Sequence, residues 1–581
     1  LGFEPRGREF ESLRACQHKS IMKKILSLIL LITMTNTGHG YDRITGEKFA
    51  SRSEVIGANG MVATSHPLAT QIGLDILKKG GTAVDAAIAA NIALGLMEPT
   101  GNGIGGDLFA IVWDADKKKL HGLNASGPAP KNISIDYFVE KGLKKIPSYG
   151  PLPVTVPGTV DGWVKLHEKF GKLEFKSLFT PTIEYAKKGF PITETIAYYL
   201  DRSKERFETY PNFKDVWLKN GRMPKKGEIF KNLQLANTLE IIAKEGRKGF
   251  YEGPVAQTMS DFIQAQGGFL SYDDLASFHS EWTPPVSSNY RGYDVWELPP
   301  NGQGIAALQI LNILENYNIK EMGLFSSEYI HLFTEAKKLA FADRAKYYAD
   351  PNFSKIPVNE LISKSYANER AKLINFDQAS KTDKPGVLES GDTIYLTVAD
   401  QYGNMVSLIQ SNYRGMGSGM MPPGLGFMLQ DRGELFSLDK KHKNALEGGK
   451  RPFHTIIPAF VTKDGEPFMS FGVMGGATQP QAHAQIIINM IDFGLNLQEA
   501  GDAPRIVHSG SSQPTDEIMQ NGGTLSLETG FGKIIENELI SKGHQLQYEK
   551  GIFGGYQAIM LKDGVFYGAS ETRKDGQAAG Y

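Results

Sequence analysis

An α/β layer structure is the fold that this 581-residue sequence predicts. Helical patterns alternate with short strand patterns, and both kinds lie on either side of one long polar segment at 376–392. Helices and strands that are each apolar on one face pack most simply as helices on sheets. The two halves are therefore expected to share one layered core rather than to form two independent domains.

The first half begins with two predicted helices. Ser65 is a typical capping residue, so a helix is expected from there to the glycine pair at 80–81. An alanine-rich helix is expected at 82–97, where Pro99 stops it. The other elements expected in this half are strands at 108–113 and 120–123, then a mainly helical region at 160–350 with helices at 160–169, 233–243 and 335–348.

After the polar segment the pattern is mainly that of β-strands. Strands are expected at 393–399 and 405–410, joined by the hairpin signal DQYGN. The Asp-Gly pairs at 464–465 and 563–564 predict two further hairpins. Helices are expected at 482–491 and 528–542.

Charge and composition exclude several classes of protein. The 63 basic and 64 acidic side chains give a net charge of -1, so no global basic field attracts nucleic acid. The 64 glycines occur in short runs without a fixed period, which excludes collagen-like and solenoid folds. No apolar run reaches the roughly 20 residues that span a bilayer, so no membrane span is expected.

The N-terminal residues predict an exported protein. Residues 1–21 are polar and are interpreted as upstream translation outside the fold. Residues 22–40 carry two lysines, an apolar run and then small residues to Gly40, which is typical of a secretory signal peptide. A periplasmic or secreted mature protein is expected. It would lack cysteine, because Cys16 is the only one, and so would have no disulfide or thiolate chemistry.

Several familiar motifs are absent or out of context. Residues 101–106 fit GxGxxG but follow a helix and precede a strand, the reverse of the dinucleotide-binding order. Ser437 begins an SxxK motif without its companion motifs. The histidines do not have metal-ligand spacing, and no GxSxG occurs. No metal, no cofactor and no serine triad are therefore expected.

The junction Asp392-Thr393, where the polar segment meets a strand, is the strongest candidate for chemistry. Cleavage before Thr393 would give it a hydroxyl nucleophile and a free α-amine, the threonine form of base-activated nucleophilic catalysis. An α-amine titrates near ~7.7–8.0, which suits a general base. Gly475 and Gly476 offer backbone N–H groups for an oxyanion hole.

Several segments, in order along the chain, resemble the γ-glutamyltranspeptidase family. The resemblance covers residues 51–581 and implies an N-terminal nucleophile hydrolase, with an αββα sandwich formed jointly by two fragments of one proenzyme. It implies that Thr393 attacks the carbonyl of Asp392 and then serves as the nucleophile. The segments are GNGIGGDLF, VTVPGTVDGWVKLHEKFG, GDTIYLTVAD, RPFHTIIP, VMGG and the terminal GASETRKDGQAAGY.

Cleavage at this bond would give a large subunit, 41–392, and a small catalytic subunit, 393–581, associated as a heterodimer. The resemblance implies that Ser411 supports the nucleophile and that Gly475 and Gly476 form the oxyanion hole. It also places Glu434 where the family has an aspartate for the substrate α-amine.

The expected acyl pocket departs from the family pattern. Thr455 matches one pocket serine, whereas His454 replaces the other and Tyr413 replaces an asparagine. The family's carboxylate-binding arginine is missing before the Ala-Pro pair at 129–130. The candidates to replace it are Arg414, Arg432 and Arg451. Of these, Arg432 is expected to bind the substrate.

Three functions remain open from the sequence. The first is an amidohydrolase or transferase that cleaves γ-glutamyl amides such as glutathione, with water or an amine as acceptor. The second keeps the mechanism but takes another small acidic amide, since NASGPAP and FGVMGGATQPQ resemble the branch that includes oxamate amidohydrolase. The third is an unprocessed periplasmic binding protein.

Overall fold

The computed structural model describes residues 43–381 and 393–581, and Phe49–Tyr581 form one compact unit. The expectations for the upstream segment 1–21, the signal peptide 22–40, Cys16 and Asp392 lie outside the described residues. The following account concerns the compact unit alone.

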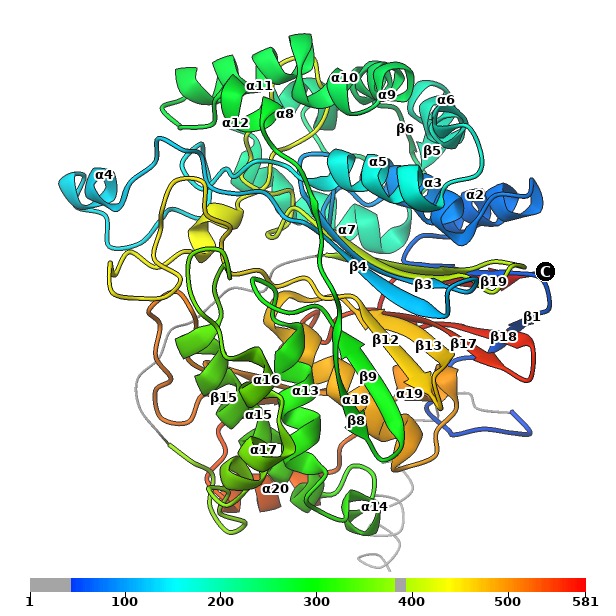
Figure 1. The fold of residues 1–581 in the computed structure, drawn as a ribbon, viewed down its shortest axis with the longest axis vertical. Helices are drawn as coiled ribbons and strands as arrows, with labels where there is room; N and C mark the ends of the chain where they lie inside the picture. The colour runs from blue at the N-terminus through cyan, green and yellow to red at the C-terminus, as the bar shows by residue number, and fades with distance from the viewer. Residues whose placement is uncertain (1–42, 382–392) are drawn as a thin grey trace, which may run out of the picture. The chain divides into compact units, whose positions relative to one another are not determined.

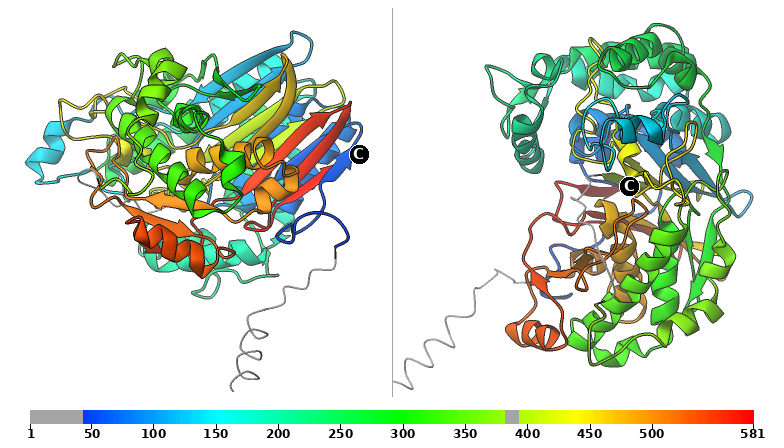
Figure 2. Two further views of the ribbon diagram at one scale, coloured as in Figure 1. Left: turned by 90° about the horizontal axis from the view of Figure 1, so that it is seen from below. Right: turned by 90° about the vertical axis from the view of Figure 1, so that its left-hand side faces the viewer.

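Two seven-stranded antiparallel sheets lie face to face between two layers of helices (Figure 1). The strands of the two sheets run in nearly the same direction, as Figure 2 shows, which is the aligned mode of sheet packing. Large apolar side chains from both sheets, including Phe109, Tyr395, Ile409 and Phe460, fill the space between them. The prediction of a shared αββα layer structure is confirmed.

The first sheet carries the strand that begins next to Thr393. Its strand order places β10 in the interior, between β2 and β11. In spatial order the strands are β19 (Gln577–Gly580), β2 (Met61–Thr64), β10 (Ile394–Ala399), β11 (Met405–Ser411), β3 (Asp107–Asp114), β4 (Lys119–Ala125) and β7 (Glu281–Trp282).

The second sheet has β13 as its central strand, and the glycine-rich segment follows β13 in the chain. In spatial order its strands are β1 (Val55–Gly57), β18 (Val565–Ser570), β17 (Tyr556–Lys562), β13 (Glu466–Val473), β12 (Ala459–Lys463), β9 (Tyr293–Glu297) and β8 (Val286–Tyr290). A small separate sheet contains β14 (Ile506–Ser509), β15 (Thr524–Leu527) and β16 (Leu546–Gln547), and β5 (Phe190–Pro191) pairs with β6 (Ile229–Phe230).

Each sheet buries its outer face under its own helical layer (Figure 1). The first layer contains α2 (Pro67–Lys78), α3 (Ala83–Met97), α5 (Thr159–Phe170), α6 (Thr180–Lys188), α7 (Glu194–Phe207), α9 (Leu233–Glu245), α10 (Arg247–Tyr251) and α11 (Gly253–Ala265). The second contains α13 (Gly304–Leu314), α15 (Ser327–Tyr347), α17 (Lys364–Ala371), α18 (Gln479–Ile491), α19 (Leu497–Asp502) and α20 (Lys533–Ser541).

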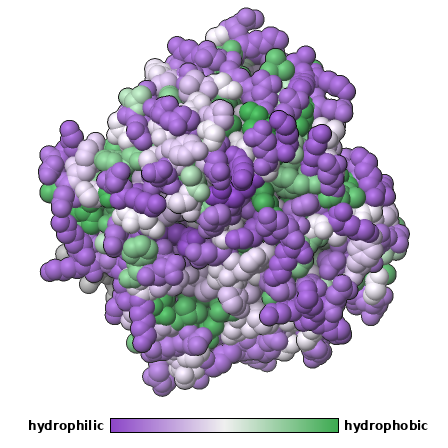
Figure 3. Space-filling model, turned by 45° about the horizontal axis from the view of Figure 1, so that its top comes forward, coloured by the Kyte–Doolittle hydropathy of each residue, from purple (hydrophilic) through white to green (hydrophobic). Residues whose placement is uncertain are grey.

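Short elements complete the unit. They are α4 (Ile135–Glu140), α8 (Phe213–Trp217), α12 (Tyr272–Ala276), α14 (Ile319–Met322), α16 (Val358–Leu361) and the 3₁₀ turns η1 (Phe175–Leu178), η2 (Arg432–Leu435) and η3 (Gly476–Thr478). Within the described ranges, no helix has the length and apolar character needed to cross a membrane. On the face drawn in Figure 3, apolar side chains form separate patches among hydrophilic ones.

Most predicted elements are present, and two details were wrong. His66, not Ser65, caps α2, because its Nδ1 accepts the Leu68 N–H whereas the Ser65 hydroxyl bonds to Glu98. The helix α20 begins at Lys533, after the glycines at 530 and 532, rather than at 528. The region 160–350 is mainly helical as predicted, and it also contains the β8–β9 hairpin.

Candidate active site

Thr393 and Ser411 lie opposite each other at one end of the β10–β11 pair. The register pairs Ile394 with Gln410, so the residue before β10 faces the last residue of β11. Both side chains are buried, and the Thr393 hydroxyl donates to Ser411 Oγ at 3.4 Å. Ser411 Oγ also accepts the Tyr413 N–H at 2.7 Å. The structure thus brings together the two hydroxyls that the sequence singled out.

The GNGIGG segment packs its backbone directly against this pair. It leads from α3 into β3, as its sequence context predicted. A Cβ on Gly106 would collide with the backbone of Ser411 and the side chain of Asn412, and one on Gly105 would collide with the Met428 carbonyl. Gly106 therefore allows close approach to Ser411, and Gly105 allows close approach to Met428, which explains these glycines without nucleotide binding.

The glycines that follow β13 approach the same end of the sandwich from the other sheet. Thr397 Oγ1 and Ser470 Oγ are 2.5 Å apart across the two sheets, and the Tyr395 ring fills the space above Gly472. The contacts across the two sheets thus pair residue 397 with 470 and residue 395 with 472. Two residues further toward the same end, Thr393 and Met474 occupy the next corresponding positions. Gly475 and Gly476 follow at once, with φ values of 123° and 56° that only glycine adopts readily.

A buried glutamine and arginine, which the sequence analysis did not select, hold this glycine segment. Gln303 Nε2 donates to the carbonyl oxygens of Thr455 and Gly476, at 2.6 and 2.8 Å. Its Oε1 accepts from Arg344, which is fully buried on α15. Neither residue belongs to a sequence motif, and α13 and α15 bring them to the site only in the folded chain.

Arg432 is buried in η2 and faces the same region. Its Nη1 donates to Thr455 Oγ1 at 2.6 Å, and its guanidinium lies 4.7 Å from the centre of the Tyr413 ring. Among the described residues, its Nε and Nη2 have no hydrogen-bond partner. Burial lowers the pKa of Arg432 to about 10, so the side chain is still charged at neutral pH. A buried cation with unused donors is suited to a carboxylate.

The other two candidate arginines are already paired. Arg414 Nε donates to both oxygens of Glu434, at 2.9 and 3.0 Å. Arg451 contacts Glu281 at 3.1 Å and donates to the Ser126 carbonyl. Glu434, which was expected to bind the substrate α-amine, therefore has a cation of its own.

Asp107 and Asp431 are buried acids that the sequence analysis missed. Asp107 Oδ1 accepts from the backbone N–H groups of Gly127 and Gly158 and from Gln430, and burial raises its pKa to about 7. Asp431 Oδ2 is buried and has no hydrogen-bond partner among the described residues. Burial, with Glu434 nearby, raises the Asp431 pKa well above its usual value.

His454 supports Asp107. Its Nε2 lies 3.0 Å from Asp107 Oδ2, and its Nδ1 accepts the Ile456 N–H. Burial, with the positive charge of Arg432 nearby, holds its pKa well below the usual value, so the ring is neutral. Both ring nitrogens of His454 have partners inside the protein, so this residue holds Asp107 in place.

In the segment where the family arginine was missing, position 127 has no room for a side chain. Gly127 donates its N–H to Asp107, and a Cβ at this position would collide with the Val156 carbonyl. Asn124 and Ser126 form a hydrogen-bond network with Asn301. This network borders a cavity of about 150 Å³ that is also lined by Arg451.

Two facing antiparallel sheets between helical layers, with a buried threonine at the start of an interior strand, define the N-terminal nucleophile hydrolase fold. The solved cephalosporin acylase from Bacillus halodurans has this fold, with a TM-score of 0.85 and 43% sequence identity over 94% of this chain and 98% of the acylase. The chain belongs to the γ-glutamyltranspeptidase family, whose model matches residues 69–581.

Curated relatives of this family carry different activities in their names. The glutathione hydrolase-like YwrD proenzyme of Bacillus subtilis is 37% identical, over 90% of this chain and 99% of its own length. The oxamate amidohydrolase proenzyme of Klebsiella pneumoniae is 32% identical, over 91% of this chain and all of its own length. The family and the enzyme class are therefore shown, whereas the names differ in substrate.

Proposed function

We propose that this protein is a self-processing threonine amidohydrolase that acts on a small amide with a carboxylate on its acyl group. The observation that carries this proposal is the hydroxyl pair of Thr393 and Ser411 at the end of the β10–β11 pair in the sheet interior, together with the positive-φ glycines at 475 and 476 that follow β13. Relatives named as proenzymes support the processing step.

The first reaction is on the chain itself. Thr393 Oγ1 attacks the carbonyl carbon of Asp392, the C–N bond between these residues breaks, and the nitrogen leaves as the α-amine of Thr393 after taking a proton. Water then hydrolyses the resulting ester. The chain ends at Asp392 and begins again at Thr393, which now carries both a nucleophile and a base.

Turnover repeats this chemistry on an external amide. The α-amine of Thr393 takes the hydroxyl proton, Oγ1 attacks the amide carbon, and the leaving amine receives that proton. Ser411 orients the nucleophile through its hydroxyl. The N–H groups of Gly475 and Gly476 stabilise the negative oxygen of the tetrahedral intermediates. Water or an amine then takes the acyl group from Thr393.

The acyl group that fits best comes from a dicarboxylic acid without an α-amine, such as a glutaryl or oxalyl group. Arg432 supplies a buried cation with two unused donor nitrogens for the distal carboxylate. Glu434 is paired with Arg414 and so is not available for a substrate ammonium group. This order of preference favours the second sequence hypothesis over γ-glutamyl amides.

A γ-glutamyl group remains the second candidate because of Asp431. Its buried Oδ2 has no hydrogen-bond partner among the described residues, although Arg414 Nε lies 3.9 Å away within ion-pair distance. An α-ammonium group would supply the missing donor and would draw the Asp431 proton away. The two candidates thus differ in one substrate group, the α-amine.

A matched pair of substrates separates the candidates. Glutaryl-p-nitroanilide and γ-glutamyl-p-nitroanilide differ only in the α-amine, and release of p-nitroaniline measures both. We expect a higher kcat/KM for the glutaryl compound, and a preference for the γ-glutamyl compound would reverse the order. An uncut wild-type chain that is folded would contradict the mechanism, whereas Thr393→Ala is expected to remain one chain by intact mass.

We also propose that the protein is exported, on the basis of the signal-like residues 22–40. Fractionation of the native host, followed by N-terminal sequencing, tests this. A start near residue 41 in the extracytoplasmic fraction is expected, and a cytoplasmic chain that keeps residues 22–40 would overturn it.

A further inference from the structure

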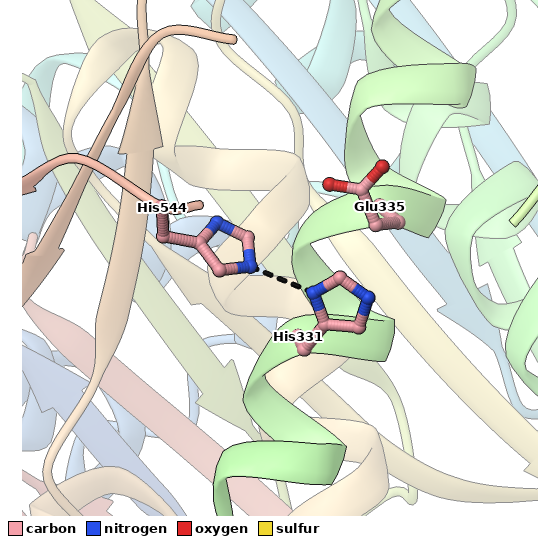
Figure 4. Close-up of side chains that lie close together, drawn as sticks. All are labelled: His331, Glu335 and His544. Atoms are coloured by element: carbon pink, nitrogen blue, oxygen red, sulfur yellow. Dashed lines mark hydrogen bonds between the residues drawn. The ribbon is translucent and has the colours of Figure 1, made fainter. Parts of the chain in front are cut away.

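A buried cluster of two histidines and a glutamate lies in the second helical layer, outside the site described above. His331 and Glu335 are one turn apart on α15, and His544 follows α20 (Figure 4). Their exposed fractions are 0%, 3% and 6%. One candidate ligand atom from each side chain lies within 4.8 Å of the others, and it is the one such group found in the described residues.

The ring of His331 already has the orientation that a metal ligand needs. Its Nε2 lies 2.8 Å from the carbonyl oxygen of Asn375. Because a carbonyl only accepts, this nitrogen carries the hydrogen and Nδ1 presents its lone pair toward His544. A histidine that ligates a metal usually donates its other N–H in this way.

The two imidazoles face each other at a distance close to that of two ligands on one ion. His331 Nδ1 and His544 Nε2 are 2.8 Å apart (Figure 4). Two nitrogens each about 2.1 Å from a tetrahedral Zn²⁺ are roughly 3.4 Å apart, so the rings need to part by about half an ångström.

We propose that His331, Glu335 and His544 form a binding site for a divalent transition-metal ion, with Zn²⁺ as the natural first probe. Two imidazole nitrogens and one carboxylate oxygen are a ligand set that such ions use widely. On binding, the ion replaces the hydrogen shared by the two rings, so His544 Nε2 gives up its proton to Nδ1 or to solvent. The sequence scan missed the set because His544 is far from the other two along the chain.

Lys338 is the competitor for this site. Its Nζ lies 2.8 Å from Glu335 Oε1 and 3.0 Å from the Ser380 carbonyl oxygen. A metal must take the carboxylate away from this ammonium group, which opposes binding both by occupying an oxygen and by its positive charge. Removal of the lysine charge is therefore expected to tighten metal binding, which a purely structural role for the histidines would not produce.

The site would tie together the parts of the chain on either side of Thr393. His331 and Glu335 precede that residue and His544 follows it. The backbone of the same region is already pinned, since Ala379 N–H donates to the Lys542 carbonyl and Ser380 N–H donates to Glu335. This bridging consequence rests on the proposed cleavage, whereas the site itself does not.

Metal binding is measured on untagged, EDTA-treated Thr393→Ala protein, so that the result is independent of processing and activity. Titration with Zn²⁺ by calorimetry is expected to show one saturable equivalent. His544→Gln and His331→Gln are each expected to weaken it at least 10-fold, and Lys338→Met is expected to tighten it. His279→Gln, at an exposed position outside the cluster, is the matched control and should bind as the parent does.

Titration with Co²⁺ gives a second readout. Absorption bands typical of nitrogen-ligated, four- or five-coordinate Co²⁺ are expected, and they should be lost in His544→Gln protein with an unchanged circular dichroism spectrum. No saturable equivalent, or an affinity that His544→Gln leaves unchanged, would overturn the proposal. If metal binds as expected while wild-type protein stays uncut, the site stands and the proposed cleavage fails.

Discussion

In the proposed function, Arg432 is the side chain that most restricts the choice of substrate. Of the three arginines that the sequence offered as replacements, two have carboxylate partners in the fold, and Arg432 has none among the described residues. The aromatic ring of Tyr413 and the hydroxyl of Thr455 fix its guanidinium. Its remaining nitrogens are thus held in place for a ligand.

Arg432→Met is expected to lower kcat/KM for glutaryl-p-nitroanilide about 100-fold, because hydrogen bonds to a charged partner contribute about 1.5–3 kcal/mol. Acetyl-p-nitroanilide, which lacks the distal carboxylate, serves as the control substrate and should lose much less. Equal losses for both substrates would show that Arg432 does not bind this carboxylate.

Asp107 gives the folded state a pH dependence. Its pKa is about 7 in the folded protein against an ordinary 3.8. Between these values the folded state binds a proton that the unfolded state lacks, so this contribution to stability is complete below about pH 4 and is lost as the pH rises to 7. Asp107→Asn removes the titrating group.

The measurement is urea unfolding of Thr393→Ala chains, with and without Asp107→Asn, from pH 4.5 to 7.5. The stability difference between the two chains should change by up to about 1.4 kcal/mol per pH unit. As the pH rises, the chain that keeps Asp107 should lose stability relative to the chain that carries the substitution. A difference that is constant with pH would contradict the raised pKa.

Among the elements, the start of α13 positions the glycine segment after β13. Gln303 precedes α13 and binds the carbonyls of both Thr455 and Gly476, while Arg344 on α15 holds the glutamine. Two helices of the second layer therefore hold the segment that contains the proposed oxyanion donors, Gly475 and Gly476.

Gln303→Met is expected to lower kcat by about 10- to 100-fold and to leave KM nearly unchanged, since it displaces groups that act in the transition state. Steady-state kinetics with the same p-nitroanilide measure both constants. Gln309→Met, further along α13 and bonded to Asp343 and Tyr348, is the matched control. A change confined to KM would instead place Gln303 in ground-state binding.

The sequence predicted those elements that short-range signals determine. The hairpins at 464–465 and 563–564 form as expected, with Asp464 and Asp563 at positive φ and glycine after each. Thr393 was selected because a polar segment meets a strand there, and Ser411 because of the family resemblance. The turn of the β8–β9 hairpin also has a residue at positive φ followed by glycine, but that residue is Arg291 instead of aspartate. The sequence analysis did not predict this hairpin, because it lies in a region where helical patterns dominate.

The rest of the site could not be predicted because long-range contacts alone create it. Asp107 is an ordinary strand residue until the backbone of residues 127 and 158 folds onto it. The pairing of Arg414 with Glu434, which leaves the Arg432 guanidinium for another partner, depends on how the chain turns after β11. No local pattern shows how these four charged residues are partnered in the fold.

At the scale of the whole molecule, both sheets combine strands from either side of Thr393. In the first sheet β10, β11 and β19 lie among β2, β3, β4 and β7, and in the second β12, β13, β17 and β18 lie between β1 and the β9–β8 pair. A cut before Thr393 therefore leaves two chains that complete each other's sheets and stay associated.

Refolding is expected to separate cut from uncut protein. Processed wild type and Thr393→Ala are unfolded in guanidinium chloride and diluted to a series of final concentrations, and recovery is followed by circular dichroism. The yield for the processed protein should fall steeply with dilution because two chains must meet, whereas the uncut chain should not show this dependence. Equal dependence on concentration would contradict the interleaved arrangement.

The mixing of strands from both parts of the chain within each sheet also has a consequence for how the protein is encoded. A gene divided at the codon for Thr393 would yield two polypeptides, neither of which holds a complete sheet, and the cell would have to make both in equal number at the same place. A single reading frame guarantees both conditions. If the proposed cleavage occurs, the arrangement gives a physical reason for the enzyme to be encoded as one precursor and divided only after it has folded.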